Sequence, residues 1–438
     1  MLHNGYYSIM PDGTVKQVNP FTGTEVWAVP GRGSKPIGNH VEVGTKRLAL
    51  KQKEDYCSFC ETRCFEIPPE RSRLVKRNGS YEKLDRVPPD QYYSTEAEFR
   101  RVGNLFEIVS IDYWRKNYGL KMTASESRWK EEYLANPAGM KHIVDVLSYK
   151  LRQLGKSESE IEKVAMEEKL RMADAFFGGG HELIIARRHY KPDAQWESDL
   201  FSSGDMTPDE HFHYFRFTVE AMRDIVENNP YSRYTSVFQN WLRPAGASFD
   251  HLHKQLVALD EWGSSIEQQI RMLRENPNAF NEFGTNFAAY HNLVIMENDQ
   301  AVAFIGIGHR FPTIEIYSRS QAGRPQEHAD EEVRGISNLV HACHAATGNQ
   351  ISCNEEWYYT PMDAVHKMPW HILIKWRVTV SAGFEGGTGI YINPVTPVEL
   401  RDRLVPKLYE LRDRGLIQGM RIAEECRTYP NPLKYYLK

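Results

Sequence analysis

The chain has 438 residues, with 54 Lys and Arg against 58 Asp and Glu, and its formal net charge is −4. This length is enough to bury a large core and to build two or more domains. The near balance of charge argues against a general nucleic-acid binder, and no apolar run approaches the roughly 20 residues of a membrane helix. The first residues lack the pattern of a signal peptide, and six cysteines do not suggest a disulfide scaffold in a chain of this length. We therefore expect a cytoplasmic protein.

The segment Asn19–Pro36 predicts a turn, a short strand around Val26–Val29, and a glycine-rich loop that carries Arg32 and Lys35. Cations on a glycine-flanked loop suit a phosphate, although solvation is the commoner role of exposed charges.

A Cys-x-x-Cys knuckle follows at Cys57 and Cys60. This spacing presents two thiolates as tetrahedral zinc requires, but two ligands are not a complete site, and the others must come from elsewhere. Cys64 is a local candidate, and a redox pair is the alternative use of the knuckle.

A strongly charged block from about residue 111 to residue 178 is predicted to be helical. Ser157 is a helix N-cap followed by apolar residues at roughly helical spacing, and Pro137–Leu154 precedes it as another helix. We interpret the block as a helical insertion whose role is a lid, an acceptor-selecting wall, a dimer contact or passive decoration.

The order of elements after the insertion is predicted to occur twice. The first set is a strand at 181–186, a helix from the capping box at Thr207–Glu210 to about Asn229, and strands at 234–240 and 250–259. The second set is strands at 291–297, 302–307, 313–317, 351–359 and 371–380, with a helix at 326–347. A last helix begins at a capping box at Thr396. This succession predicts an α+β fold of mainly antiparallel sheets flanked by helices.

The most informative segment is the strand predicted at Asp250–Leu259. With a period of two, His251, His253 and Gln255 share one face, and burying such polar groups is costly unless they have partners. A neutral imidazole fixed in one tautomer offers its other nitrogen as a nucleophile or a metal ligand. The small residues of the Ala245–Ser248 turn allow backbone N–H groups to approach anionic oxygens. Phosphorus chemistry is therefore expected, and the alternative is a strand with two structural histidines.

The sequence FQNWLRPAGASFDHLHKQ resembles the active-site segment of the galactose-1-phosphate uridylyltransferase-like family, the transferase and phosphorylase branch of the histidine-triad superfamily. The matching positions, at fixed offsets, are Phe238, Asn240, Gly246, Ser248, His251, His253 and Gln255. The resemblance implies that His253 is the nucleophile that carries a nucleoside monophosphate and that Gln255 and Ser248 contact its phosphate. It also makes Asn240 and Gly246 substrate-binding residues. Gln255 stands where the hydrolase branch has a third histidine.

The same resemblance implies roles for residues outside this segment. Cys57, Cys60, His189 and His251 would hold a structural zinc ion, Arg32 would meet the nucleotide phosphates, and Asn104 and Phe106 would line the base pocket. The AGFEGGTGIYINP loop at 382–394 resembles a motif of one branch of the family and makes Phe384, Gly387 and Thr388 substrate-binding residues. Residues that hold a hexose in the galactose enzymes are replaced here by Gly383, Thr388 and Gly389. Galactose is therefore in doubt, and the GTG form recurs in members that act by phosphorolysis.

The resemblance implies two duplicated histidine-triad-like halves, 1–260 and 261–438, with the helical insertion at about 111–178 in the first half. Aligning the halves places His371, Leu373 and Lys375 opposite His251, His253 and Gln255, so the second half would have lost the chemistry. The implied function is ping-pong nucleotidyl transfer from a nucleotide sugar or dinucleotide to a phosphate or sugar-phosphate acceptor. A homodimer is compatible with this function. The alternatives are a catalytically silent nucleotide-binding regulator and a dinucleoside polyphosphate hydrolase.

Overall fold

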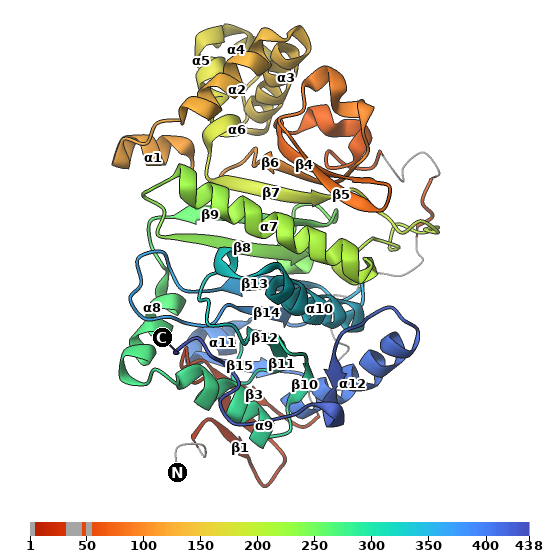
Figure 1. The fold of residues 1–438 in the computed structure, drawn as a ribbon, viewed down its shortest axis with the longest axis vertical. Helices are drawn as coiled ribbons and strands as arrows, with labels where there is room; N and C mark the ends of the chain where they lie inside the picture. Colours follow the sequence, from red (N-terminus) through yellow and green to blue (C-terminus); the bar gives the residue numbers. More distant parts are fainter. Residues whose placement is uncertain (1–4, 32–45, 50–54, 438) are drawn as a thin grey trace.

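One 12-stranded sheet extends through the molecule, in the order β16-β10-β11-β12-β14-β13-β8-β9-β7-β6-β4-β5 (Figure 1). The computed structural model describes residues 5–31, 46–49 and 55–437. The strands of one end are β4 (Glu70–Arg77), β5 (Ser80–Asp85), β6 (Ala97–Gly103), β7 (His181–Ala186), β8 (Tyr234–Trp241) and β9 (His253–Leu259). The strands of the other end are β10 (Val294–Glu297), β11 (Ala301–Ile305), β12 (Thr313–Ser318), β13 (Cys353–Tyr358), β14 (His371–Trp376) and β16 (Arg421–Ile422). The two ends join where β8 pairs antiparallel with β13.

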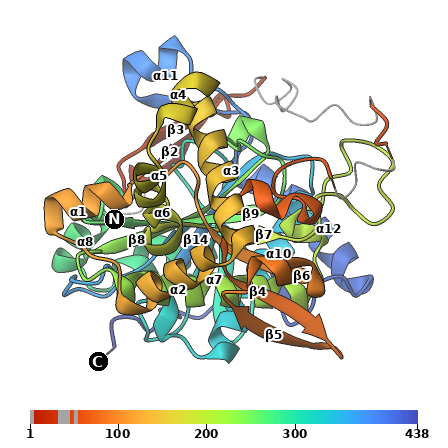
Figure 2. The ribbon, with the colours of Figure 1, turned by 90° about the horizontal axis from the view of Figure 1, so that it is seen from above.

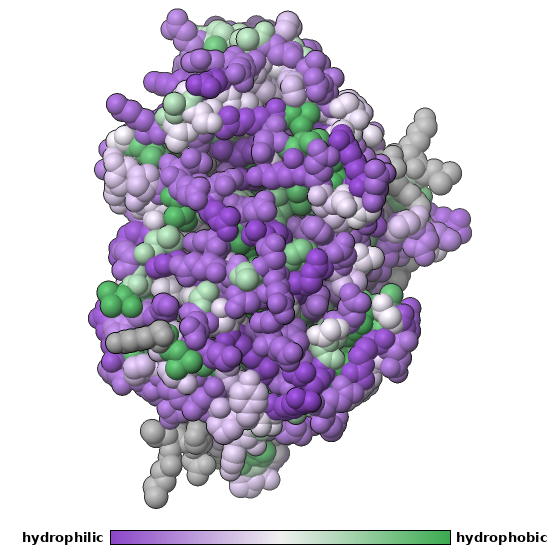
Figure 3. All heavy atoms as spheres, viewed as in Figure 1, coloured by the Kyte–Doolittle hydropathy of each residue, from purple (hydrophilic) through white to green (hydrophobic). Residues whose placement is uncertain are grey.

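Two long helices, α7 (Pro208–Asn228) and α10 (Asp330–Thr347), lie side by side on one face of this sheet (Figure 1). The capping box predicted at Thr207–Glu210 is present and begins α7. Apolar side chains of both helices pack against alternate residues of the strands and form the main core. The surface on this side is mainly hydrophilic (Figure 3). Among the described residues, no helix is both long enough and apolar enough to cross a membrane.

The predicted helical block consists of six helices at the β4–β6 end of the sheet (Figure 1). They are α1 (Ile111–Tyr118), α2 (Ala124–Ala135), α3 (Pro137–Gln153), α4 (Glu158–Lys163), α5 (Met166–Met172) and α6 (Asp174–Gly178). The helix expected after Ser157 is divided, because Val164 and Ala165 have extended ψ angles of 119° and 143° that interrupt it. These helices form a second apolar cluster together with Cys64, Val87 and Tyr92, which precede them in the sequence.

A four-stranded sheet lies on the face of the large sheet opposite α7 (Figure 2). It contains β1 (Tyr7–Ile9), β2 (Val15–Val18), β3 (Glu25–Ala28) and β15 (Ile390–Asn393), and β15 runs parallel to β3. Asn19 Nδ2 donates a hydrogen bond of 2.9 Å to Ile307 O, which fixes the beginning of the chain to the second half. The domain boundary at residue 260 stays a prediction, because β-strands from both sides of it share both sheets.

The remaining helices are α8 (Ser264–Glu275), α9 (Phe287–Tyr290), α11 (Gly383–Thr388) and α12 (Pro397–Asp413), and α12 begins at the predicted Thr396 cap. The predicted strands are present with small changes of bounds. The largest change near the proposed chemistry concerns β9, which begins at His253 rather than at Asp250. The reason is that the N–H groups before His253 make no ladder, and the His251 side chain is directed to the Cys-x-x-Cys knuckle instead.

Candidate active site and metal site

His253 is the first residue of β9 and lies between β7 and β8 in the sheet. Its Nδ1 donates to His251 O at 2.8 Å, because a carbonyl oxygen can only accept. Burial lowers the pKa of the ring, so the neutral form predominates near pH 7 with its proton on Nδ1. Phe59 packs edge-on against the ring at 5.1 Å. The lone pair of Nε2 is therefore the reactive position.

Gln255 is held by a histidine that sequence reasoning missed as a site residue. Oε1 of Gln255 lies 3.2 Å from Nε2 of His181, and the side-chain nitrogen of Asn104 lies 2.9 Å from the same atom. The Ile108 N–H donates to Nδ1 of His181 at 3.0 Å, and burial lowers the pKa of His181 to about 4. The neutral imidazole of His181 thus joins Gln255, the predicted phosphate-binding residue, to Asn104, a predicted base-binding residue. The sequence signal that could have identified His181 is its position as the polar first residue of the strand HELIIA.

The turn before β9 is tighter than expected. Leu242 has φ of 68° and Gly246 has φ of 91°, and the second of these favours glycine. The N–H groups of Ala245, Gly246 and Ala247 donate within the turn, to Leu242 O or Arg243 O. The expectation that this run of N–H groups faces a phosphate is therefore wrong for these three. Ser248 is exposed, and neither its N–H nor its hydroxyl is bonded to another described residue.

Asn240 lies on β8, the strand beside β9, two residues beyond Phe238, which pairs with Gln255. It lines a cavity of about 510 Å³ together with Ala245 and residues of β13. The cavity therefore adjoins the predicted active-site segment and is bounded on its far side by the second half of the chain.

Cys57, Cys60, His189 and His251 come together from three distant segments, and their ligand atoms all lie within 4.8 Å of one another. Cys57 Sγ lies 4.0 Å from Cys60 Sγ, 3.4 Å from Nδ1 of His189 and 3.6 Å from Nδ1 of His251. Bonds of about 2.3 Å from zinc to sulfur and about 2.0 Å to nitrogen produce such separations in a tetrahedron. Nε2 of His251 donates to Ala186 O at 2.6 Å, which leaves Nδ1 as the ligand atom. These residues could hold a metal ion such as zinc.

Other predicted site residues lie apart from this cluster. Arg32, like Lys35, is outside the described residues. Phe106 follows β6 in an exposed loop. Phe384, Gly387 and Thr388 lie on α11, which projects from the molecule on the side opposite α7 and does not line the cavity beside Asn240 (Figure 2). Cys64, the local alternative as a ligand, is buried elsewhere and contacts Tyr93.

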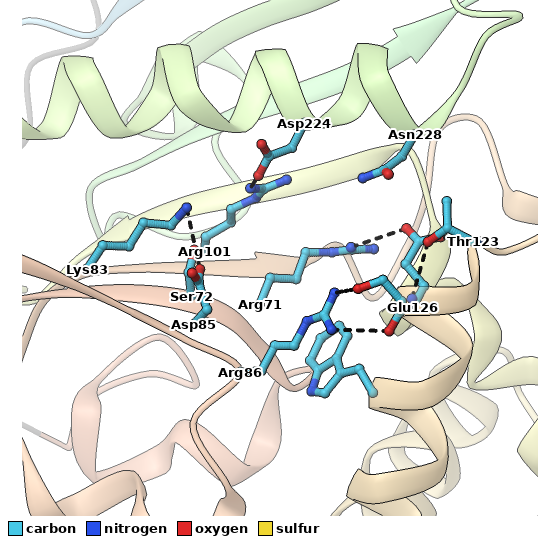
Figure 4. A pocket seen from close by; sticks show the side chains of 12 residues that line it. Arg71, Ser72, Lys83, Asp85, Arg86, Arg101, Thr123, Glu126, Asp224 and Asn228 are labelled. Carbon is cyan, nitrogen blue, oxygen red and sulfur yellow. Dashed lines mark hydrogen bonds and ion pairs between the residues drawn. The ribbon is translucent and has the colours of Figure 1, made fainter.

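A second cavity, of about 430 Å³, lies between α2, α7 and the strands β4–β6 (Figure 4). Arg71 and Arg101 both bind Glu182, and Arg101 also binds Asp224 of α7. Arg101 and the neighbouring Val102 point to opposite faces of the sheet, and Val102 is on the face of Phe59. The cavity is therefore on the reverse face from His253. An ion pair of 3.7 Å between Arg71 and Glu126 of α2 attaches the helical insertion to the sheet (Figure 4).

Comparison with known proteins supports the architecture. A family model described as "Domain of unknown function (DUF4921)" matches residues 10–435. The crystal structure of an ADP-glucose phosphorylase from Arabidopsis thaliana with bound ADP-glucose is similar with a TM-score of 0.56, at 17% identity, over 90% of this chain and 98% of that one. A galactose-1-phosphate uridylyltransferase-like protein from the same plant has a TM-score of 0.54, at 17% identity, over 89% and 98%. No curated protein sequence matches. The predicted resemblance and fold class are confirmed at the level of the fold.

Proposed function

This chain belongs to the DUF4921 family, and we propose that it is a nucleotidyltransferase that carries a nucleoside monophosphate on His253. The observation that supports this most directly is the tautomer of His253, whose Nδ1 is bonded to the His251 carbonyl and whose Nε2 is left as a nucleophile. A buried, neutral imidazole with one free ring nitrogen is suited to attack on phosphorus.

The first half-reaction is the attack of Nε2 of His253 on the α-phosphorus of a nucleotide sugar or dinucleotide. A P–N bond forms, and the P–O bond to the leaving phosphate breaks. The ring gains positive charge as the bond forms, and the His251 carbonyl, which accepts from Nδ1–H, stabilises it. In the second half-reaction an oxygen of the acceptor phosphate attacks the same phosphorus, and the P–N bond breaks.

The groups around the phosphate have separate roles. Gln255 and Ser248 donate to non-bridging oxygens, and each well-placed donor contributes about 3 kcal/mol to the stabilisation of the transition state. Gln255 cannot protonate a leaving group, which favours transfer between phosphates, because a phosphate leaves without being protonated. Asn104 and Phe106 meet the base, and the phosphate-binding role expected of Arg32 from its sequence stays a prediction.

Cys57, Cys60, His189 and His251 would hold a zinc ion, which would supply a cross-link between the knuckle and the beginning of the nucleophile strand. The fit of the site rests on two thiolate and two imidazole donors at tetrahedral separations. His251 is both a ligand and, through its carbonyl, the partner of Nδ1 of His253. The role of the site is to fix the position of this carbonyl.

Inorganic phosphate is the acceptor that we favour. Two observations favour phosphate: the fold similarity to an ADP-glucose phosphorylase and the GTG sequence at residues 387–389. A sugar phosphate as acceptor would make the protein a transferase of the uridylyltransferase kind. The two are distinguished by product analysis with each acceptor in turn.

The test is the intact mass of the protein after incubation with ADP-glucose, UDP-glucose, UDP-galactose and diadenosine tetraphosphate in separate reactions. We expect an acid-labile adduct of AMP or UMP on the wild-type protein and on His371→Ala, and none on His253→Ala. No adduct with any donor, despite nucleotide binding, would contradict the proposal and favour the silent regulator. Nucleoside monophosphate released equally fast with and without phosphate would favour the hydrolase.

A further inference from the structure

The second half of the chain reaches the predicted phosphate region through two polar side chains. Asn354 of β13 is directly opposite Asn240 of β8 in the sheet. Asn354 Nδ2 donates to Asn240 Oδ1 at 2.7 Å and to Ala245 O at 2.8 Å. Arg377, just after β14, donates from Nη1 to Asn354 Oδ1 at 2.8 Å. A continuous hydrogen-bonded chain therefore runs from Arg377 through Asn354 to Asn240.

The direction of every hydrogen bond in this series is fixed by the groups at its two ends. The Ala245 carbonyl can only accept and the Arg377 guanidinium can only donate, so the Asn354 amide has one possible orientation. Its NH₂ group then faces Asn240, whose oxygen must be the acceptor. As a result, the Asn240 NH₂ group is directed away from the second half. It lies on the side of Gly246, where a Cβ atom would be 3.9 Å from Asn240 Nδ2.

Arg377 is also held in place independently of the asparagines. Its guanidinium lies over the ring of Phe311 at 4.6 Å. Burial and the nearby Arg310 lower the pKa of Arg377, and Glu356 opposes them. Glu356 is already bound by Lys375 Nζ at 2.6 Å and by the hydroxyl of Tyr358. Arg377 also lines the cavity beside Asn240, so it brings a guanidinium group to this end of the cavity, which suits an anion.

The position of this charge matches the side on which a leaving group must lie. The predicted base residue Asn104 is on the β6–β7 side of β9, through its contact with His181. Asn240, Asn354 and Arg377 are on the opposite side of β9, on or after β8, β13 and β14. Neighbouring strands are about 4.8 Å apart, so these three hydrogen-bonded side chains extend away from His253 in steps of that size. A donor with its base at Asn104 directs its other phosphate toward this cavity.

We propose that Asn354 and Arg377 form the subsite for the phosphate that leaves in the first half-reaction and enters in the second. This inference rests on the proposed function, since it assigns the acceptor side of the same site. Arg377 binds this phosphate directly and is held by Asn354 Oδ1. Asn354 also holds the Asn240 NH₂ group on the Gly246 side, as a donor to the neighbouring α-phosphate. The ligand class is a nucleoside diphosphate derivative, or inorganic phosphate beside a nucleoside monophosphate.

The test compares the binding of nucleoside diphosphates and monophosphates by calorimetry. Arg377→Gln should weaken ADP or UDP binding by about 10- to 100-fold, the range for the loss of a hydrogen bond to a charged group. AMP or UMP binding should change by no more than about twofold. Arg310→Gln is the matched control, because Arg310 lies close by but is bonded to Ser381 and stacked on Tyr391. It should leave the preference for diphosphates unchanged. The proposal would be overturned if Arg377→Gln weakened the binding of both ligand classes equally, or if it weakened the binding of neither.

A measurement on the wild-type protein remains informative even if Arg377→Gln fails to fold. Inorganic phosphate should compete with ADP or UDP but should bind together with AMP or UMP. Competition with the monophosphate as well would place phosphate at the α-position and overturn the subsite.

The intact-mass experiment separates this inference from the proposed function. Phosphate competition with diphosphates alone but no His253 adduct would leave the subsite standing and reject the transferase. An adduct on the wild-type protein with an unchanged diphosphate preference in Arg377→Gln would support the transferase and reject the subsite. A wild-type protein that binds no nucleotide would overturn both.

Discussion

The two halves of the large sheet each begin a strand with a buried histidine, and the two histidines have the same local geometry. Nδ1 of His253 is bonded to His251 O at 2.8 Å, and Nδ1 of His371 is bonded to Pro369 O at 2.9 Å. Both bonds reach the carbonyl two residues earlier. His371 therefore corresponds to His253, which corrects by two residues the sequence alignment that placed it opposite His251.

The difference between the halves lies in what surrounds the second ring nitrogen. His253 has Phe59 on one side and the polar groups of Gln255 and His181 nearby. His371 is enclosed by aromatic rings, with centroid distances of 4.8 to 5.2 Å to Tyr317, Tyr358 and Phe280. Leu373 takes the place of Gln255, two residues further along the strand. The second half has kept the histidine and filled the space that a substrate would need.

The largest expected effect compares the two histidines directly. His253→Ala should lower nucleotidyl transfer by at least about 10⁴-fold, because it removes the nucleophile. His371→Ala should retain the adduct but lose about 2–4 kcal/mol of unfolding free energy, because it leaves a cavity among packed rings. Intact mass and urea unfolding measure the two effects. An adduct on His253→Ala, or its absence from a folded His371→Ala protein, would contradict the comparison.

A buried ion pair connects the two halves behind the nucleophile. Lys254 of β9 binds Glu355 of β13 at 2.5 Å, and both side chains are inaccessible to solvent. Lys254→Met should cost about 3–5 kcal/mol, because it leaves the buried Glu355 carboxylate without its lysine partner. Adding Glu355→Gln should recover part of this loss. The exposed pair Lys141–Asp145 is the control, and Lys141→Met should change the unfolding free energy by less than about 0.5 kcal/mol.

Acid should destabilise the protein partly through His371. Burial lowers the pKa of His371 to about 4, whereas an unfolded histidine has a pKa of about 6.5. Below pH 6.5 the unfolded chain binds a proton that the folded chain does not, so stability falls as the pH falls. Over these 2.5 units the wild type should lose about 3 kcal/mol relative to His371→Gln. Urea unfolding at pH 6.5 and at pH 4 measures this, and equal losses in both proteins would contradict it.

The metal site is a feature of the first half that should support the nucleophile from a distance. Cys60→Ser should reduce the zinc content, measured by elemental analysis, and lower nucleotidyl transfer by about 10- to 100-fold. The reason is that the His251 carbonyl loses its fixed position beside His253. Cys64→Ser, which leaves all four candidate ligands in place, should change neither. Full activity in a zinc-free Cys60→Ser protein would reject the positioning role.

Much of the fold could be predicted because its signals are local. The capping box at Thr207–Glu210, the helix spacing of the insertion and the strand at His181–Ala186 depend on residues close in sequence. One boundary that failed depends on a distant partner. β9 begins late because His251 turns to the knuckle at Cys57.

The candidate site likewise has parts that the sequence predicts and parts that depend on distant partners. The sequence alone determined the fixed-offset segment from Phe238 to Gln255 and the knuckle spacing of Cys57 and Cys60, because both are short-range patterns. Only the tertiary structure placed His181 against Gln255, 74 residues away, and Asn354 against Asn240, 114 residues away. Strand pairing over such separations is decided by the packing of the complete sheet rather than by local preference. For the same physical reason, the structure and not the sequence identified His371 as the counterpart of His253.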